Sequence, residues 1–161
     1  MVKWVEPIFD RTQEDVNFAK EQIEKWIADN LIGNPPETYE LKGCLNLSDL
    51  NRIEGNIQYI SDRLGELQYP VGASCKNWVI SDLPTERDLR RILSNVRLII
   101  SSYYQQTGVA NIPMNMSGYS DINAIEENLY KIKELIDSMI KGFQKSGGFQ
   151  SGAMRMLPIR R

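Results

Sequence analysis

The 161-residue chain is 42% hydrophobic, has no histidine and contains two cysteines that lie far apart, Cys44 and Cys75. These features exclude a zinc site and a His-based catalytic pair, and the length suits one domain or two small ones that share a core. Residues 141–161 carry five cations and no acid, so the net charge of −2 divides into +5 there and −7 on residues 1–140. The mildly acidic body argues against a nucleic-acid-binding body. The basic tail alone could touch nucleic acid or an acidic protein groove, and the groove is favoured for so few charges.

The first predicted elements are an extended lead-in and a helix. Residues 3–9 are expected to be extended because Pro7 has no amide hydrogen and disfavours helical backbone in the residue before it. Thr12 is the predicted N-cap, since Thr12 and Asp15 have the spacing of a capping box with Asp in place of Glu. The helix is expected to end at Gly33. Its apolar residues at helical spacing are Val16, Ala19, Ile23, Trp26 and Ile27.

A connector and a second helix come next. We expect a sharp turn at Gly43 and a helix that starts near Asn46 or Ser48 and ends between residues 65 and 70. Its apolar stripe consists of Leu50, Ile53, Ile57, Ile60 and Leu64. Residues 72–84 resemble the lead-in, and their apolar run 78–80 could pair as a strand with the segment around Trp4 or remain unpaired.

Two further helical patterns complete the predicted body. The third helix is expected over residues 85–104 and the fourth over residues 118–141, each with an apolar stripe on one face. Four such stripes can be buried only against one another. The sequence therefore predicts an all-α bundle of two helical hairpins with short, extended, Trp-bearing lead-ins.

An internal repeat supports this pairing of helices. The pattern DLNRIEGNIQYI from Asp49 returns as DLRRILSNVRLI from Asp88 and as DINAIEENLYKI from Asp121, with a weaker copy from Asp15. These spacings indicate two tandem units of about 73 residues, residues 1–74 and 75–141.

Matching positions of the two units are expected to bury matching faces. The sequence places Asn56 on Asn128 and Ile23 on Val96. The tryptophans of the two lead-ins, Trp4 and Trp78, could stack on a ligand, but we assign them to the ends of the core.

The repeated polar residues have structural roles in this interpretation. The asparagines are Asn56, Asn95 and Asn128; they could line a ligand groove, but hydrogen bonds to neighbouring loop carbonyls, which fix helix register, are favoured. The aspartates are Asp15, Asp49, Asp88 and Asp121; we assign them to first turns of helices, where the pKa of a carboxyl group is depressed. A depressed pKa does not suit acid catalysis.

The sequence shows no catalytic constellation. It contains no glycine-rich phosphate loop after a strand, no G-x-S-x-G motif and no metal-ligand cluster. We therefore expect a protein that is not an enzyme and uses no cofactor. No stretch approaches ~20 apolar residues, so no membrane-spanning segment is expected.

Residues 142–161 differ in kind from the body. Their four glycines disfavour a helix, yet the segment keeps apolar and basic side chains at intervals. This mixture is typical of an extended arm that becomes ordered when it docks on a partner. The expected docking residues are Phe143, Phe149, Met154, Arg155, Met156, Leu157, Ile159, Arg160 and Arg161.

Three motifs resemble proteins encoded in the tail modules of phages and prophages of Gram-positive bacteria. DRTQEDV at residues 10–16 and LKGCLNLSDLNRIE at residues 41–54 resemble the D-R-T-x-x-D-V opening and the L-K-G-x-x-N-x-x-D-L-N-R core of those small structural proteins or domains. FQSGAMRMLP at residues 149–158 is similar to their closing segments.

The resemblance implies a virion component at the tail tip, baseplate or fibre attachment, assembled in the bacterial host cytoplasm and working as a scaffold. Its partners would be other tail structural proteins and further copies of the chain, and neither nucleic acid nor membrane. The alternative is a cytoplasmic helical adaptor or regulator that binds a single protein partner.

Overall fold

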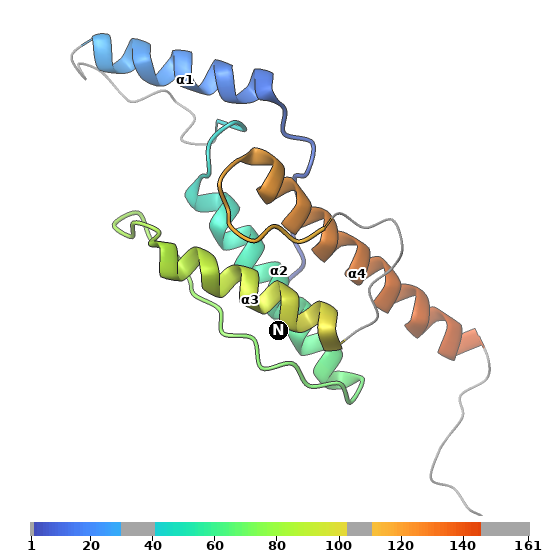
Figure 1. The fold of residues 1–161 in the computed structure, drawn as a ribbon. Coiled ribbons are helices and arrows are strands. Elements are labelled where there is room, and N and C mark those ends of the chain that lie inside the picture. Colours follow the sequence, from blue (N-terminus) through green and yellow to red (C-terminus); the bar gives the residue numbers. More distant parts are fainter. Residues whose placement is uncertain (1, 30–40, 103–110, 146–161) are drawn as a thin grey trace, which may run out of the picture.

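The structure is a computed structural model that describes residues 2–29, 41–102 and 111–145. Within these ranges the chain forms four helices and no strand. The helices are α1 (Gln13–Ala28), α2 (Leu47–Glu66), α3 (Glu86–Ser102) and α4 (Tyr119–Lys145) (Figure 1). The predicted all-α fold class is confirmed.

The first helices begin at capping boxes. The Asp15 amide donates to the Thr12 hydroxyl over 3.2 Å, and the Thr12 amide donates to the Asp15 carboxylate over 2.7 Å. At the start of α2 the Asn46 amide donates to the Asp49 carboxylate over 2.9 Å. These bonds occupy amide hydrogens that have no partner inside the helix, and they fix where α1 and α2 begin.

The hydrophobic core lies between α2, α3 and α4, which all pack against one another. The five stripe residues predicted for the second helix are all buried. The stripes of α3 and α4 supply Ile92, Leu93, Val96, Ile99, Ile122, Ile125, Leu129, Ile132 and Ile136. Trp78 of the second lead-in is also part of this core, and Trp4 packs against its edge.

The first helix, α1, lies across one end of the bundle, at the top of Figure 1, and makes at most marginal contact with the other helices. Of its predicted stripe only Ala19 is buried, whereas Ile23 is 38% exposed and Ile27 58% exposed. Because Val96 is 0% exposed, the expected match in burial between Ile23 and Val96 is wrong. The core-facing side of α2 is already covered by α3 and α4, so no room remains there for α1.

A close approach of backbones holds the start of α1. A Cβ atom added to Gly43 would lie 2.1 Å from the carbonyl oxygen of Asp15, so only glycine fits this position. Lys42, next to Gly43, forms ion pairs with Asp10 over 3.0 Å and with Asp15 over 3.6 Å. The turn predicted at Gly43 therefore also attaches α1 to the chain that leads into α2.

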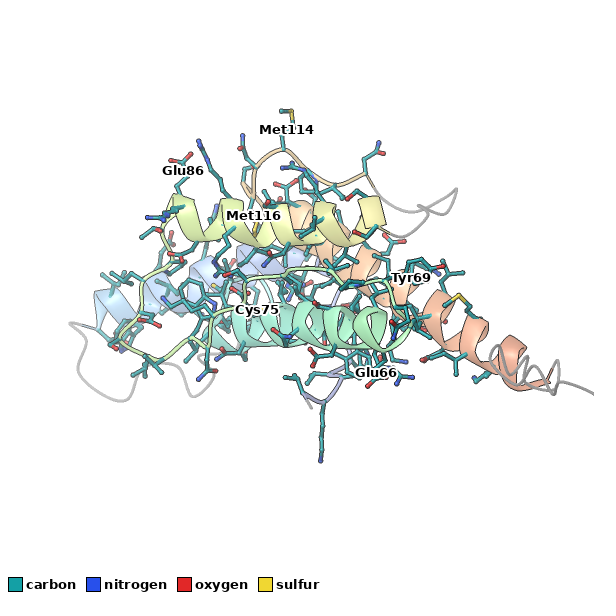
Figure 2. The ribbon with its side chains drawn as sticks, turned by 90° about the horizontal axis from the view of Figure 1, so that it is seen from below. Glu66, Tyr69, Cys75, Glu86, Met114 and Met116 are labelled. Carbon is teal, nitrogen blue, oxygen red and sulfur yellow. The ribbon has the colours of Figure 1, made fainter. Side chains whose placement is uncertain are left out.

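Two extended segments run along the bundle. The N-terminal segment, residues 2–11, contacts α2 and α4, and the central segment, residues 69–79, runs along α2 and α3 (Figure 2). Within the described ranges the two segments do not pair as strands.

The C-terminal end of α4 differs from the expected domain boundary. The helix continues to Lys145, so Gly142 and Phe143 belong to helical backbone and not to an extended arm. One isolated glycine costs a helix only about 1 kcal/mol, which the rest of α4 can offset. The division into units 1–74 and 75–141 stays a prediction, although α2 from the first and α3 and α4 from the second share one core.

Candidate functional site

Two buried asparagines each hold one residue of an extended segment by both of its backbone groups. Asn56 accepts from the Val5 amide over 3.0 Å and donates to the Val5 carbonyl over 2.8 Å. Asn95 does the same with Ser74, over 3.2 Å and 2.8 Å. Each side-chain amide thus supplies the two hydrogen bonds that a neighbouring β-strand would supply.

Two more asparagines act in the same way and were not singled out from the sequence. Asn51 holds both backbone groups of Trp78, over 2.8 Å and 3.0 Å, and Asn123 holds those of Arg11, over 3.3 Å and 2.9 Å. Asn51 and Asn123 are both the second residue after the aspartate of their repeat copy. That shared offset is the signal that could have identified them.

The third repeated asparagine, Asn128, is 1% exposed and donates to the carbonyl of Ala124, four residues earlier in α4, over 2.6 Å. This bond is local to the helix, in contrast to the long-range bonds of Asn56. Asn56 and Asn128 are both buried, as their matching positions in the repeat predicted.

A buried cluster of charges joins the N-terminal segment to α2 and α4. The Arg11 guanidinium lies 2.8 Å from Asp49 and 3.2 Å from Glu126, and Arg52 lies 2.7 Å from Glu126 and also contacts Asp49. All four side chains are at most 9% exposed. Two cations and two anions balance one another, so the net charge of the cluster is zero.

A second cluster occupies the matching place between α2 and α3. Glu54 is 2% exposed, pairs with Arg91 and accepts a hydrogen bond from the Trp78 indole nitrogen over 3.3 Å. Glu54 and Glu126 occupy the same position in their repeat copies. The repeat thus encodes a buried carboxylate that is neutralised by an arginine from a neighbouring helix, a role that sequence reasoning missed.

The helix-start aspartates divide into two groups. Hydrogen bonds from Thr12 lower the pKa of Asp15, and hydrogen bonds from Thr85 lower the pKa of Asp88. Burial raises the pKa of Asp121, but hydrogen bonds from Ser117 and Gly118 outweigh it and the net shift is downward. Asp49 also lies in a first turn, but it is 3% exposed and bound to two arginines, so helix capping is only part of its role.

The cysteines lie in environments that disfavour the thiolate. Burial, with the Glu54 carboxylate adding to it, raises the pKa of Cys75 to about 12. Burial also raises the pKa of Cys44, and the Asp49 carboxylate adds to the effect. Both side chains are therefore protonated thiols at neutral pH, which disfavours a role as nucleophile.

An open groove of about 460 Å³ separates the first half of α1 from the bundle. One wall is formed by Val16 and Lys20 of α1, and the other by Leu89, Met116 and Ile122. Met116 comes from the segment before α4, in which Met114 is 85% exposed and projects away from the body (Figure 2). The groove leaves part of the apolar face of α1 accessible.

The predicted docking residues of the C-terminal arm fall mostly outside the described residues. Phe143 lies in the last turn of α4. The others, Phe149, Met154, Arg155, Met156, Leu157, Ile159, Arg160 and Arg161, lie outside the described ranges.

Comparison with protein-family models, with curated proteins and with solved structures found no match. In the described ranges no three acidic or cysteine side chains gather as metal ligands, and no helix there is long and apolar enough to cross a membrane. The arrangement binds extended polypeptide through asparagines and buries its charges in internal pairs, so its chemistry is that of holding chain segments in place.

Proposed function

We propose that this chain is a non-enzymatic structural subunit of a phage tail or tail-like particle, at the tail tip, baseplate or fibre attachment. The observation that carries the proposal is α1, an amphipathic helix that lies off the core and exposes Ile23 and Ile27. An apolar helix face that no other described helix covers favours a surface for another protein. The motifs at residues 10–16 and 41–54 resemble those of tail proteins and favour that class of partner.

The buried polar groups support a scaffolding role. Glu54 and Glu126, the two carboxylates buried at the repeat's shared position, are both neutralised by arginines. A general acid or base needs a proton that can be exchanged with a substrate, and these carboxylates are committed to internal pairs. Their use is to fix the N-terminal and central segments on the bundle.

The proposed partners are other tail structural proteins and further copies of this chain, and the proposed location is the virion tail. The arm that follows α4 would dock on a neighbouring subunit through its apolar residues, with its arginines meeting carboxylates there. Neither nucleic acid nor a membrane is a proposed partner.

The test is incorporation into particles. Particles are purified from cells that produce either the full chain or a chain without residues 146–161, and immunoblotting with immunogold electron microscopy locates the protein. We expect the full chain on the tail, and the truncated chain in the cytoplasm with an unchanged helical signal and melting temperature. A full chain that is absent from particles, and is recovered in the cytoplasm with one other protein, would instead establish the adaptor alternative.

A further inference from the structure

We propose that α1 is the surface through which two copies of this chain associate, as an antiparallel pair of α1 helices whose two-fold axis passes between Glu21 and Gln22. This pairing is inferred from the exposure and sequence of α1 alone. It would therefore stand if the chain proved to be a cytoplasmic adaptor and not a virion protein.

The accessible face of α1 has the spacing of a helix-pairing seam. Val16, Lys20, Ile23 and Ile27 follow one another at intervals of four, three and four residues, which places them in one line along the helix. Ile23 and Ile27 are 38% and 58% exposed although they are the largest apolar residues of the seam. This line of side chains is available for a second helix.

The repeat indicates what kind of helix fits there. The first, fourth and eighth residues after the repeat's aspartate are Leu50, Ile53 and Ile57 in α2, and all three are buried against α3 and α4, which carry the same stripe. The same offsets in α1 give Val16, Ala19 and Ile23. In this protein stripes of this pattern pack against one another, whereas α1 makes at most marginal contact with the other three described helices and buries only Ala19 of its stripe.

Charge selects the antiparallel orientation. With the axis between residues 21 and 22, Val16 of one copy meets Ile27 of the other, and Lys20 lies beside Ile23 and Glu24 of the other copy. Lys20 and Glu24 are exposed, and neither has an ion-pair partner in the described chain. The two-fold axis forms the Lys20–Glu24 contact twice, whereas a parallel pair would place Lys20 against Lys20.

The groove beside α1 provides space for the end of the second helix. Val16 lines it together with Leu89, Met116 and Ile122. In the antiparallel pair Ile27 of the other copy comes next to Val16, so that apolar side chain enters the groove. A single helix per copy buries less than the roughly 800 Å² per partner of a stable complex, so we expect a pair that dissociates on dilution.

Sedimentation equilibrium of the full chain from low micromolar to several hundred micromolar concentration tests the association. We expect a monomer–dimer equilibrium for the unchanged chain and a dissociation constant at least tenfold higher for Ile23→Asp. Phe18→Asp is the matched control, because Phe18 is 56% exposed on the opposite side of the same helix, and this change should leave the dimer intact. Circular dichroism verifies that each variant stays folded.

Charge reversal and cross-linking test the orientation. Lys20→Glu should weaken the dimer, and adding Glu24→Lys to it should restore association. In chains that also carry Cys44→Ser and Cys75→Ser, oxidising a mixture of Val16→Cys and Ile27→Cys chains should link the two kinds, while Ile27→Cys alone stays unlinked. A monomer at every concentration, loss of the dimer in Phe18→Asp, or rapid linking of Ile27→Cys alone would each overturn the proposal. Absence from virions would refute the proposed function and leave these results unaffected.

Discussion

The side-chain amide of Asn56 is bonded to both the amide and the carbonyl of Val5, 51 residues earlier in the chain. Asn95 holds Ser74 in the same manner over a separation of 21 residues. Extended segments need partners for their backbone groups, and a neighbouring strand is the usual one. Here helices supply those partners through single side chains, so the segments need no sheet.

Replacing Asn56 with alanine leaves the Val5 amide and carbonyl without these bonds. We expect a loss of about 1–3 kcal/mol in the free energy of unfolding, the net contribution of two hydrogen bonds at about 0.5–1.5 kcal/mol each, because water can reach the half-exposed Val5. Asn17→Ala is the control, because the Asn17 side chain is exposed on α1 and, among the described residues, bonds only Gln13. This change should alter stability by at most about 0.5 kcal/mol. Urea titration compares the two variants, and equal losses would show that the bonds to Val5 contribute little.

Truncating Glu126 removes the carboxylate that Arg11 and Arg52 share. Because both guanidinium groups stay buried, we expect Glu126→Ala to cost about 3–5 kcal/mol. Glu86→Ala serves as the comparison, since Glu86 and Arg90 are 77% and 69% exposed and such pairs contribute at most about 1 kcal/mol. Guanidinium denaturation measures both, and a small loss for Glu126→Ala would mean that water replaces the carboxylate.

Core truncations should separate the bundle from α1. Ile57→Ala and Leu129→Ala remove 0%-exposed side chains and should each cost about 2–5 kcal/mol. Ile27→Ala, at 58% exposure, should change the stability of the monomer by no more than about 0.5 kcal/mol. Thermal melting at low protein concentration provides the measurement. A large loss for Ile27→Ala would place α1 in the folding core.

Asp49 and Asp88 begin the same repeat pattern but should respond differently to substitution. A role at a helix start alone would predict a cost of about 0.5–2 kcal/mol for Asp49→Ala. The structure raises the expected cost for Asp49→Ala to about 3–5 kcal/mol, while Asp88→Ala keeps the smaller value. Without the Asp49 carboxylate, Arg11 and Arg52 would share Glu126 alone, which leaves one buried positive charge uncompensated. Equal losses in chemical denaturation would contradict the network around Asp49.

Acid should weaken the fold through its helix-start carboxylates. The pKa values of Asp15, Asp88 and Asp121 are lowered in the folded chain from an ordinary value of 3.8. Their contribution to stability is thus complete above about pH 4 to 5 and is lost as the pH falls through the lower, folded values. Melting temperatures from pH 7 to pH 2.5 should fall less steeply for Asp15→Asn combined with Asp88→Asn than for the unchanged chain, and identical slopes would refute the effect.

Local patterns predicted the helices and most of the core. The spacing of Thr12 and Asp15 located the start of α1, and the stripe that contains Ile53 and Ile57 located the buried face of α2. Periodicity shows that a helix has an apolar face, but it does not show which element covers that face. The same pattern therefore placed α1 in the bundle, whereas the structure leaves Ile27 exposed.

The polar interior could be predicted only in part. Asn51 and Asn123 recur at one offset from the repeat's aspartate, as do Glu54 and Glu126 at another, so their importance is visible in the aligned copies. Their partners are not. Arg52 reaches Glu126 across 74 residues, and only the arrangement of α2 beside α4 brings the two together.

The contacts of Arg11 in the N-terminal segment affect the order in which this chain folds during its synthesis. A ribosome releases Arg11 early, but Asp49 follows 38 residues later and Glu126 follows 115 residues later. Domains of a growing chain fold as their contacts become available, so Arg11 stays without its Glu126 partner until α4 has been synthesised. A translation product that stops before residue 119 would lack α4, and its segment 2–11 would lose the contacts with α4 and keep those with α2, such as the bonds between Asn56 and Val5.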